Sequence, residues 1–501
     1  MNIPLTALLA GTETQTFTDS PLPAISGLCY DSRKAKPGDL FFALKGAHAD
    51  GASYVHEAVA RGVVAVVAKE GIPGCPVPVV CAANVRAVMA DIAAAFYGHP
   101  ARTMKVVGIT GTNGKTTTAF LTRHILDAEF RRTGLIGTVK YAVADRVTDA
   151  PRTTPESVDL QALLAQMRDS SCRAAVLEVS SHALTQSRSR GIEFDAAVFT
   201  NLTQDHLDYH GSMEAYFEAK ASLFEGLSRQ TEKKGRAIIN GEDRHGRLLI
   251  RRLEKTPVPT LTYGLGAQAD FRATDTQFDA QGSAFHLHAR GRSYLVKFPL
   301  IGGFNVSNAL AALAASASVG MEVRAAVRAL ADAPQVPGRL ERIPARRSFQ
   351  VFVDYAHTED ALRNALDTLR SLSPRRLLVV VGCGGDRDRT KRPLMAAAAS
   401  HLADFCIFTS DNPRSEDPGQ ILADMTTGLR GTNFEVLPDR NAAIRHAVGL
   451  VEAGDILLIA GKGHENYQEL ATGRVPFDDA KIARFAIEER RVEFEEEEAR
   501  P

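Results

Sequence analysis

A glycine-rich segment, residues 110–118 with the sequence TGTNGKTTT, points more directly to chemistry than any other part of the chain. It follows an apolar run at residues 105–109 and precedes a stretch typical of a helix, which extends through Asp127. In such an arrangement the backbone N–H groups of the loop and the start of the helix bind phosphate oxygens. Lys115 could then reach the terminal phosphates, and Thr116 could offer its hydroxyl to Mg²⁺.

The segment departs from the strict P-loop spacing, because Ile109 stands where that motif has its first glycine. A generic glycine-rich turn is therefore the alternative. The succession of a strand, the GKT triplet and a helix favours the phosphate site and predicts an ATP-consuming enzyme. The residues expected around the phosphates are Gly111, Thr112, Asn113, Gly114, Lys115, Thr116 and Thr117.

Two further strand-like runs are followed by arginines that suit the binding of carboxylates. Residues 382–389, GCGGDRDR, lack the G-x-G-x-x-G spacing of a dinucleotide site, and their charges favour a loop that binds a polar substrate. Arg387 lies in this loop, and Arg414 closes the sequence DNPR after another apolar run. Both guanidinium groups could clamp carboxylates in a bidentate way, whereas a surface turn is the alternative reading.

Carboxylate and imidazole groups follow two other predicted strands. Glu178 closes the apolar run 174–177, at the carboxyl end where α/β sheets carry functional side chains. Residues 200–211 are rich in oxygen and imidazole donors and precede a helix with Lys220, whose position alone is typical of a surface residue. The pattern suggests a Mg²⁺ site beside phosphates, with Glu178 opposite Thr116, although a polar loop with a helix cap is the alternative.

The elements that must position these groups predict an α/β protein of three domains. A chain of 501 residues is too long for one core, and breaks near Pro100 and at residues 334–338 divide it. We expect an N-terminal domain at 1–100, a central P-loop domain with a parallel sheet at 101–336, and a C-terminal Rossmann-like, doubly wound domain at 337–501. Its buried strands are expected at 349–353, 377–381, 405–409 and 456–459. The glutamate-rich residues 493–498 are expected to be a solvated helix end or disordered.

Composition excludes several classes of function. Lysine plus arginine and aspartate plus glutamate each number 59, so no overall basic field favours nucleic acid. No apolar run approaches the roughly 20 residues that span a bilayer, and the start of the chain lacks a basic signal region, which predicts a cytoplasmic protein without membrane insertion. The six cysteines are scattered along the chain and none forms a C-x-x-C pair, so we expect reduced thiols rather than disulfides or a zinc site.

Together these motifs closely resemble the Mur ligases over nearly the whole chain. The matching segments are 31–33 (DSR), 110–118, 178–182 (EVSSH), 205–211, 354–357 (DYAH), 384–387, 411–414 and 461–465 (GKGHE). The resemblance implies an ATP-dependent ligase that forms an amide bond through an acyl phosphate in peptidoglycan precursor synthesis. The DNPR segment resembles the diaminopimelate form of its motif, which implies addition of meso-2,6-diaminopimelate to the D-glutamate of UDP-N-acetylmuramoyl-L-alanyl-D-glutamate.

The resemblance also implies roles for individual residues. Beyond the loop, ATP would contact Asn305, Arg339 and Asp354. The UDP-muramoyl dipeptide would contact Ser32, Ala47, His48, Ala49, Thr153, Thr154, Ser180, Gln186 and Arg188. Diaminopimelate would contact Arg387, Asp411, Asn412, Pro413, Arg414, Gly461 and Glu465, with Arg414 on the far carboxylate that lysine lacks. Mg²⁺ would be held by Thr116, Glu178, His206 and Lys220 as a carbamate, with Lys115, Lys220 and His206 as the catalytic residues.

Some alternatives stay open. A lysine-adding or folylpolyglutamate-type ligase is the nearest rival, and a nucleotide-hydrolysing switch protein is a rival of another class. Arg414 and the DSR segment at 31–33 argue against the first two. Arg152 stands where better-known Mur ligases resemble one another in having asparagine, so the polar contact at that position is open. We expect a monomer whose C-terminal domain swings closed over the site.

Overall fold

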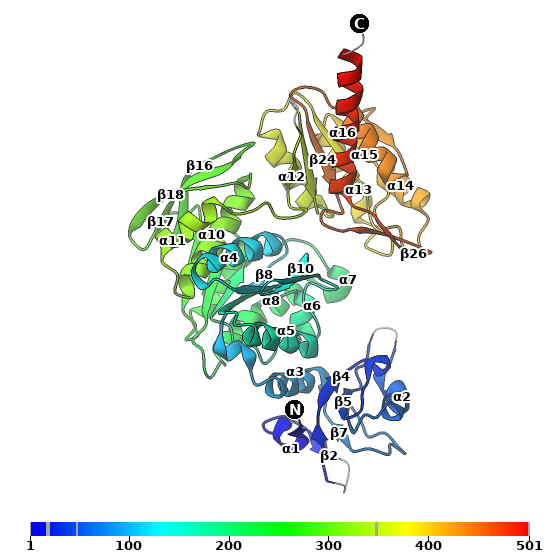
Figure 1. Ribbon diagram of the computed structural model, residues 1–501. Coiled ribbons are helices and arrows are strands. Elements are labelled where there is room, and N and C mark those ends of the chain that lie inside the picture. The colour runs from blue at the N-terminus through cyan, green and yellow to red at the C-terminus, as the bar shows by residue number, and fades with distance from the viewer. Residues whose placement is uncertain (1, 17–20, 47–48, 346–348, 499–501) are drawn as a thin grey trace.

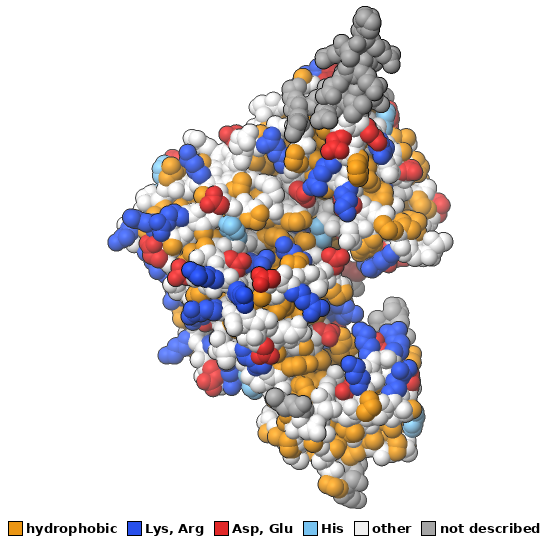
Figure 2. Space-filling view, in the orientation of Figure 1, with side chains coloured by type: hydrophobic (Ala, Val, Ile, Leu, Met, Phe, Trp, Pro, Cys, Tyr) orange, Lys and Arg blue, Asp and Glu red, His pale blue; other side chains and the backbone are white. Residues whose placement is uncertain are grey.

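The computed structural model describes residues 2–16, 21–46, 49–345 and 349–498, with side chains described up to residue 490. Three α/β units follow one another along the chain, and the central one lies between the other two (Figure 1). The described helices include none that is both long and apolar enough to cross a membrane. Positive and negative side chains are mixed over most of the visible face (Figure 2), as expected for a chain with a formal net charge of zero.

The N-terminal unit is built on a five-stranded sheet in the order β2-β7-β6-β5-β4. Strands β4 to β7 run parallel, and β2 is antiparallel to β7. The strands are β2 (Gln15–Thr16), β4 (Gly27–Cys29), β5 (Asp39–Phe42), β6 (Ala65–Ala68) and β7 (Val79–Cys81). Helices α2 (Val55–Ala60) and α3 (Val85–Phe96) accompany them, together with β1 (Ile3–Pro4), α1 (Leu5–Leu8), β3 (Ala24–Ile25) and the short 3₁₀ turns Ser32–Lys34, Gly51–Tyr54 and Pro100–Thr103.

The central unit has an eleven-stranded sheet in the order β11-β10-β9-β12-β8-β13-β14-β15-β16-β17-β18. The strands are β8 (Lys105–Thr110), β9 (Thr133–Ile136), β10 (Lys140–Val143), β11 (Arg146–Asp149), β12 (Ala174–Glu178), β13 (Ala196–Phe199), β14 (Arg236–Asn240), β15 (Thr260–Gly264), β16 (Phe271–Asp279), β17 (Gly282–Ala289) and β18 (Arg292–Phe298). Its middle is parallel, as expected, but both edges are antiparallel. Short turns join the edge strands, and such turns permit only antiparallel pairing.

Helices cover both faces of the central sheet. On one face lie α4 (Lys115–Phe130), α10 (Gly303–Ser318) and α11 (Val323–Ala331). On the other face lie α5 (Ser157–Asp169), α8 (Met213–Leu227) and α9 (Arg244–Leu253), and the short helices α6 (Ser181–Thr185) and α7 (Leu207–His210) follow β12 and β13. The parallel strands in the middle of the sheet, such as β8, β12 and β13, are buried on both sides, so their sequences are continuous apolar runs that could be recognised.

The C-terminal unit has a six-stranded sheet in the order β19-β20-β24-β21-β22-β23, parallel except for β19. The strands are β19 (Glu341–Ile343), β20 (Gln350–Asp354), β21 (Leu377–Val381), β22 (Phe405–Phe408), β23 (Phe434–Val436) and β24 (Ile456–Ala460), followed by the hairpin β25 (Tyr467–Leu470) and β26 (Gly473–Pro476). Helices α12 (Glu359–Arg370), α13 (Lys391–Leu402) and α14 (Pro418–Thr426) cover one face. Helices α15 (Arg440–Leu450) and α16 (Asp479–Glu498) cover the other, so the sheet is doubly wound and the glutamate-rich residues end α16.

Candidate active site

The glycine-rich loop is held in shape by the end of the neighbouring strand β13. Gly111 has φ +150°, and a Cβ there would lie 1.8 Å from the Thr200 hydroxyl, so no other residue fits without a shift. The Thr200 hydroxyl donates to the carbonyl of Asn113 at 2.6 Å, and the Asn113 amide donates to Asn201 Oδ1 at 2.9 Å. Helix α4 begins at Lys115, directly after Gly114 in the left-handed region. The loop and helix start therefore have the geometry that binds phosphate.

Lys115 folds back over this loop. Its Nζ donates to the carbonyls of Gly111 at 2.9 Å and Thr112 at 2.8 Å. Burial lowers the pKa of Lys115 from its usual value, and the carboxylates of Glu178 and Asp205 offset part of that effect. The amine is thus held inside the loop by carbonyls that a phosphate could replace as partners.

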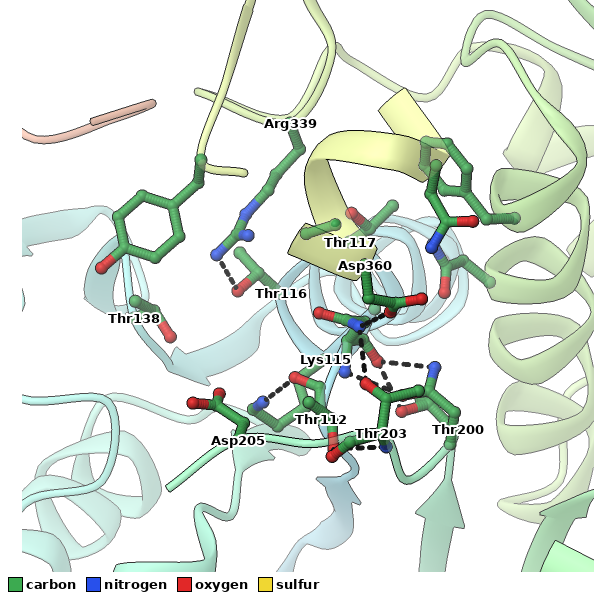
Figure 3. A pocket seen from close by; sticks show the side chains of 18 of the residues that line it. Thr112, Lys115, Thr116, Thr117, Thr138, Thr200, Thr203, Asp205, Arg339 and Asp360 are labelled. Atoms are coloured by element: carbon green, nitrogen blue, oxygen red, sulfur yellow. Dashed lines mark hydrogen bonds between the residues drawn. The ribbon is translucent and has the colours of Figure 1, made fainter. Parts of the chain in front are cut away.

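Glu178 ends strand β12 and faces the start of α4. Its side chain is fully buried and accepts hydrogen bonds from the Thr116 hydroxyl at 3.0 Å, the Thr138 hydroxyl at 2.9 Å and the Thr138 amide at 2.9 Å. Arg339, from the C-terminal unit, donates to the Thr116 hydroxyl at 3.2 Å (Figure 3). A carboxylate and a hydroxyl at this separation fit Mg²⁺, which takes few protein ligands when phosphates supply the rest. Among the described residues no group of three or more His, Cys, Asp and Glu is gathered to hold a metal.

Lys220 on α8 lies inside the protein, where its helix position alone suggested the surface. It is 1% exposed, its Nζ donates to the Gly111 carbonyl at 2.8 Å and lies 4.5 Å from the centre of the Tyr216 ring. Burial, together with the positive charge of Lys115, lowers the pKa of Lys220 well below its usual value. The environment therefore shifts this amine toward its neutral form, beside the phosphate loop.

His206 precedes α7 and has a left-handed backbone, with φ +53°. Its Nε2 lies 3.4 Å from Asp205 Oδ2, and its ring packs edge-on against His182. Burial lowers the pKa of His206, so the neutral imidazole that binds metals is favoured. Asp205 and His206 both line the same cavity as Lys115 and Lys220.

That cavity, of about 470 Å³, lies between the central and C-terminal units. Its central-unit wall contains Thr112, Asn113, Gly114, Lys115, Thr116, Thr117, Thr138, Thr153, Ser180, Ser181, Thr200, Asn201, Thr203, Asp205, His206, Tyr216, Lys220, Asn240, Phe304, Ser307 and Asn308. Its other wall contains Arg339, Asp354, Tyr355, His357, Asp360, Ala361, Asn364 and Ala365. In Figure 3 Arg339 and Asp360 reach toward the loop from the second wall.

The three further residues expected around ATP occupy different places. Arg339 and Asp354 line the cavity, and Arg339 also stacks on the Tyr355 ring, 4.7 Å from its centre. Burial raises the pKa of Asp354 to about 6, although its oxygens accept two backbone N–H groups. Asn305 is 1% exposed and receives a hydrogen bond from Asn308, the residue of α10 that does line the cavity.

The central-unit residues expected to meet the muramoyl peptide form one connected cluster. The Thr154 hydroxyl donates to the Glu178 carbonyl at 2.7 Å, and Arg188 donates to the Thr154 carbonyl at 2.9 Å and to Gln186 Oε1 at 2.6 Å. The remaining two members, Thr153 and Ser180, line the cavity.

A buried glutamate, Glu156, organises the arginines near this cluster. It is 5% exposed and pairs with Arg188 and Arg152 through Oε1, each at 2.9 Å, and with Arg86 of the N-terminal unit through Oε2 at 2.8 Å. Arg152, which departs from the family's pattern, therefore has an ion-pair partner in its own segment. Burial lowers the pKa of Arg188, and the nearby Glu156 carboxylate offsets part of that effect.

The two described N-terminal candidates, Ser32 and Ala49, do not line the cavity. Ser32 is 6% exposed and donates to Glu57 at 3.0 Å, in a turn that Asp31 caps. Ala49 is exposed and its carbonyl accepts from the Gly46 amide. Ala47 and His48 lie outside the described residues.

The candidates for the amino-acid pocket come together at the carboxyl ends of β21, β22 and β24. Asn412 donates to Glu465 at 2.8 Å, and a Cβ on Gly461 would lie 2.6 Å from the Asp411 carboxylate. Arg414 donates to the Gly385 carbonyl at 2.7 Å and pairs with Glu469 at 3.2 Å. Pro413 connects Asn412 to Arg414, and Arg387 lies on the adjoining loop, where its guanidinium donates to the Asp386 carbonyl.

Sequence reasoning missed several cavity and pocket residues. Thr138, Asn308, Asp360 and His357 line the cavity, and Glu469 and Lys462 pair with predicted pocket residues. The DYAH and GKGHE segments gave a signal for His357 and Lys462, because both residues stand inside them. The others stand alone in the sequence and are brought to the site only by the fold.

Comparisons with known proteins agree with this architecture. The chain matches the Mur ligase family catalytic domain over residues 24–97, the Mur ligase middle domain over 109–316 and the Mur ligase glutamate ligase domain over 338–463. It is 47% identical to the UDP-N-acetylmuramoyl-L-alanyl-D-glutamate--2,6-diaminopimelate ligase of Geobacillus kaustophilus, over 93% of this chain and 96% of that protein. It is 46% identical to the protein of the same name from Synechococcus elongatus, over 97% and 99%.

Solved structures of related ligases have a similar fold. A structure of UDP-N-acetylmuramoyl-L-alanyl-D-glutamate--2,6-diaminopimelate ligase, 35% identical, superposes with a TM-score of 0.71 over 98% of this chain and 100% of that one. A Mycobacterium tuberculosis folylpolyglutamate synthase shares the fold at 21% identity, with a TM-score of 0.60 over 74% and 91%. The matches of sequence, domain order and fold together show that this chain belongs to the Mur ligase family.

Proposed function

We propose that the chain joins meso-2,6-diaminopimelate to the D-glutamate of UDP-N-acetylmuramoyl-L-alanyl-D-glutamate, coupled to the cleavage of ATP into ADP and phosphate, in the synthesis of peptidoglycan precursors. The observation that carries the proposal is a single cavity with the phosphate loop on one wall and the C-terminal unit on the other. The full-length relatives that carry the name of this ligase support the choice of substrates. We further propose that the enzyme is a cytoplasmic monomer.

The reaction first needs a better leaving group than oxide on the D-glutamate side chain. An oxygen of its γ-carboxylate attacks the γ-phosphorus of ATP, which breaks the bond to the ADP oxygen and gives an acyl phosphate. The amine of diaminopimelate then attacks the acyl carbon, and the tetrahedral intermediate expels phosphate as the amide forms. Both steps gather negative charge on oxygens, so the enzyme acts mainly through positioning and electrostatic stabilisation.

The phosphate loop supplies most of that stabilisation. Backbone N–H groups of the loop would bind the β- and γ-phosphates, and Lys115 would exchange its two carbonyl partners for phosphate oxygens. Arg339, now bonded to Thr116, is close enough to the same region to add a second cation. Charges that line a cavity inside the protein act more strongly than charges in bulk solvent.

Mg²⁺, when bound, would screen the phosphate charges and so favour attack by a carboxylate. Thr116 and Glu178 are the residues proposed to hold one ion, and the buried oxygen pair at 3.0 Å supports this assignment. His206 and a carbamate on Lys220 are proposed to hold a second. The neutral Lys220 amine favoured by burial is the form that adds to CO₂, with loss of one proton, to give that carbamate.

The pocket around Arg414 is proposed to select the amino acid. Arg414 and Arg387 carry the positive charge suited to the far carboxylate of diaminopimelate, and Glu465 carries the negative charge suited to an ammonium group. L-Lysine lacks that carboxylate and would leave the Arg414 charge without a ligand partner. The muramoyl peptide is proposed to lie along Thr153, Thr154, Ser180, Gln186 and Arg188, with the uridine nucleotide near Ser32 and residues 47–49.

The test is phosphate release from ATP by the purified protein with the UDP-muramoyl dipeptide, in parallel with meso-diaminopimelate, with L-lysine and without an amino acid. The proposal predicts release and a tripeptide product with diaminopimelate alone. Preference for lysine would contradict the assignment of Arg414. Release that is indifferent to both amino acids would favour a nucleotide-hydrolysing switch protein instead.

A further inference from the structure

The loop after β24 buries a lysine that the proposed reaction does not use. Lys462 follows Gly461, and its side chain is 0% exposed. An ammonium group removed from water is stable only when it is paired and hydrogen-bonded. Both polar partners of this ammonium belong to the proposed amino-acid pocket.

Lys462, Asn412 and Glu465 form a closed triangle of hydrogen bonds. Lys462 Nζ donates to Asn412 Oδ1 and to Glu465 Oε2, each at 2.9 Å. Asn412 Nδ2 donates to the same Glu465 oxygen at 2.8 Å. The backbone N–H of Glu469 also donates to Asn412 Oδ1, at 2.9 Å, so it helps Lys462 to fix which end of the amide faces the glutamate. Only Lys462 brings a positive charge to the Glu465 carboxylate within this triangle.

This triangle leaves one glutamate oxygen for a ligand. Glu465 Oε2 already accepts from two donors, whereas Oε1 accepts, among the described residues, one long hydrogen bond from Tyr355 at 3.5 Å. A carboxylate oxygen has room for two hydrogen bonds. Oε1 is thus the oxygen free to receive an ammonium group, and its direction depends on how Oε2 is held.

The backbone of the loop forces Lys462 inward. Gly461 has φ +114°, and a Cβ there would lie 2.6 Å from the Asp411 carboxylate. Gly463 has φ +53°, and a Cβ there would lie 2.8 Å from the Gly338 carbonyl. The two close approaches make a tight turn, and the Lys462 Nζ lies 5.5 Å from the centre of the Tyr467 ring.

We propose that Lys462 is a positioning residue for the acceptor amino acid, acting through Glu465 and Asn412. The ammonium of Lys462 keeps the pocket formed before the ligand arrives, so the ligand does not have to order it. The inference rests on the proposed function for the existence of an acceptor, but not on which amino acid the acceptor is.

The test is the substitution Lys462→Met, which keeps the length of the side chain and removes its charge and donors. The expected result is a rise of about 10- to 100-fold in the KM for the acceptor, as for loss of a charge-assisted contact, with the KM for ATP changed by less than about twofold. A matched control is Arg376→Met, which breaks an ion pair with the buried Asp455 at the amino end of β21, in the same unit. This control is expected to lower the melting temperature without changing either KM.

A double substitution separates positioning from general destabilisation. If Lys462 acts through Glu465, adding Lys462→Met to Glu465→Gln raises the acceptor KM little beyond the single Glu465→Gln change. Full additivity, or equal rises in the KM of all substrates, would overturn the inference. Lys462→Gln, which keeps one neutral donor, carries the same test if the methionine variant does not fold.

Assays of the wild-type protein distinguish failure of the proposed function from failure of the inference about Lys462. If wild-type shows no release of phosphate that depends on any amino acid, the proposed function has failed. If wild-type depends on an acceptor and Lys462→Met leaves its KM unchanged, only the inference about Lys462 has failed.

Discussion

The central unit meets its two neighbours in different ways. Toward the N-terminal unit, helix α3 packs against α5, Val158 joins the N-terminal hydrophobic core, and the ion pairs Arg86–Glu156 and Arg190–Asp91 cross the boundary. Toward the C-terminal unit, the two walls of the cavity are linked by hydrogen bonds from Asn113 to Asp360 and from Arg339 to Thr116. Ile301 of the central unit joins the C-terminal hydrophobic core, so both interfaces have an apolar contact. Among the described residues, ion pairs cross only the N-terminal boundary, and the cavity lies at the C-terminal one.

This difference indicates that the C-terminal unit moves relative to the central unit more readily than the N-terminal unit does. An interface with buried apolar area and carboxylate–arginine pairs is costly to open, whereas hydrogen bonds around a cavity are readily exchanged for ligand or water. We therefore expect the N-terminal and central units to remain together while the C-terminal unit opens and closes over the site.

The largest effect is expected at the cavity wall that holds the phosphate loop. Lys115→Met should lower the rate of product formation by about 10²- to 10³-fold, because a cation aimed at the developing phosphate charge is lost. Steady-state rates check this prediction, and near-normal activity would separate this loop from the chemistry.

The next effect concerns the C-terminal wall. Arg414→Met should lower kcat/KM for diaminopimelate by about 100-fold and change that for lysine little, because lysine has no far carboxylate for the guanidinium. Arg474→Met is the matched control, since Arg474 lies 3.6 Å from the same Glu469 but is largely exposed. Equal losses for the two amino acids would show that Arg414 does not discriminate between them.

At the N-terminal interface, Glu156→Gln should raise the KM for the UDP-muramoyl dipeptide about tenfold and destabilise the protein by about 1–3 kcal/mol. The buried carboxylate pairs with Arg188, which is proposed to meet that substrate, and with Arg86 across the boundary. Arg86→Met alone should reproduce the loss of stability with a smaller change in KM. Initial-rate kinetics and denaturant unfolding of both variants test this, and an unchanged KM in Glu156→Gln would argue against positioning of Arg188.

A smaller effect is expected from Asp360→Ala. The change removes the hydrogen bond to Asn113 across the cavity, 3.0 Å long, and should shift the open–closed balance by only a few-fold, because one hydrogen bond contributes about 1 kcal/mol net. Hydrogen exchange should rise in α12 and in the phosphate loop without any rise in α3 or α5. Faster exchange in α3 would contradict the idea that the two interfaces are independent.

The smallest effect is a pH dependence of closure. His464 packs against Tyr355 at the C-terminal interface, and burial lowers its pKa to about 3. The solvated imidazole of an open form would protonate near pH 6.5, so the open form binds more protons and is favoured as pH falls from 6.5 toward 3. Scattering profiles at pH 7 and pH 5.5 should show opening in wild-type and less change in His464→Gln.

Sequence patterns predicted the features that depend on residues close together in the chain. Strand β8, the loop after it and the start of α4 are contiguous, and the buried strands of the C-terminal sheet are unbroken apolar runs. The antiparallel strands β16 to β18 were not anticipated, because strands that alternate buried and exposed residues give a weaker pattern than parallel strands buried on both faces. Lys220 has the sequence context of an exposed helix, and only packing against Tyr216 and the loop makes it buried.

Contacts between residues far apart in the chain were the hardest to predict from the sequence. Glu469 pairs with Arg414 from a hairpin 55 residues away, and Asp360 meets Asn113 across 247 residues. No spacing rule links such positions, because the fold alone determines their distance.

The acyl phosphate route can be tested by following one oxygen atom. The UDP-muramoyl dipeptide is labelled with ¹⁸O in the D-glutamate γ-carboxylate and incubated with ATP, Mg²⁺ and diaminopimelate, and the phosphate released is analysed by mass spectrometry. An acyl phosphate route transfers one ¹⁸O from the carboxylate to each phosphate. Unlabelled phosphate would mean that water or another group receives the γ-phosphoryl group, and it would contradict the ligase mechanism proposed for this cavity.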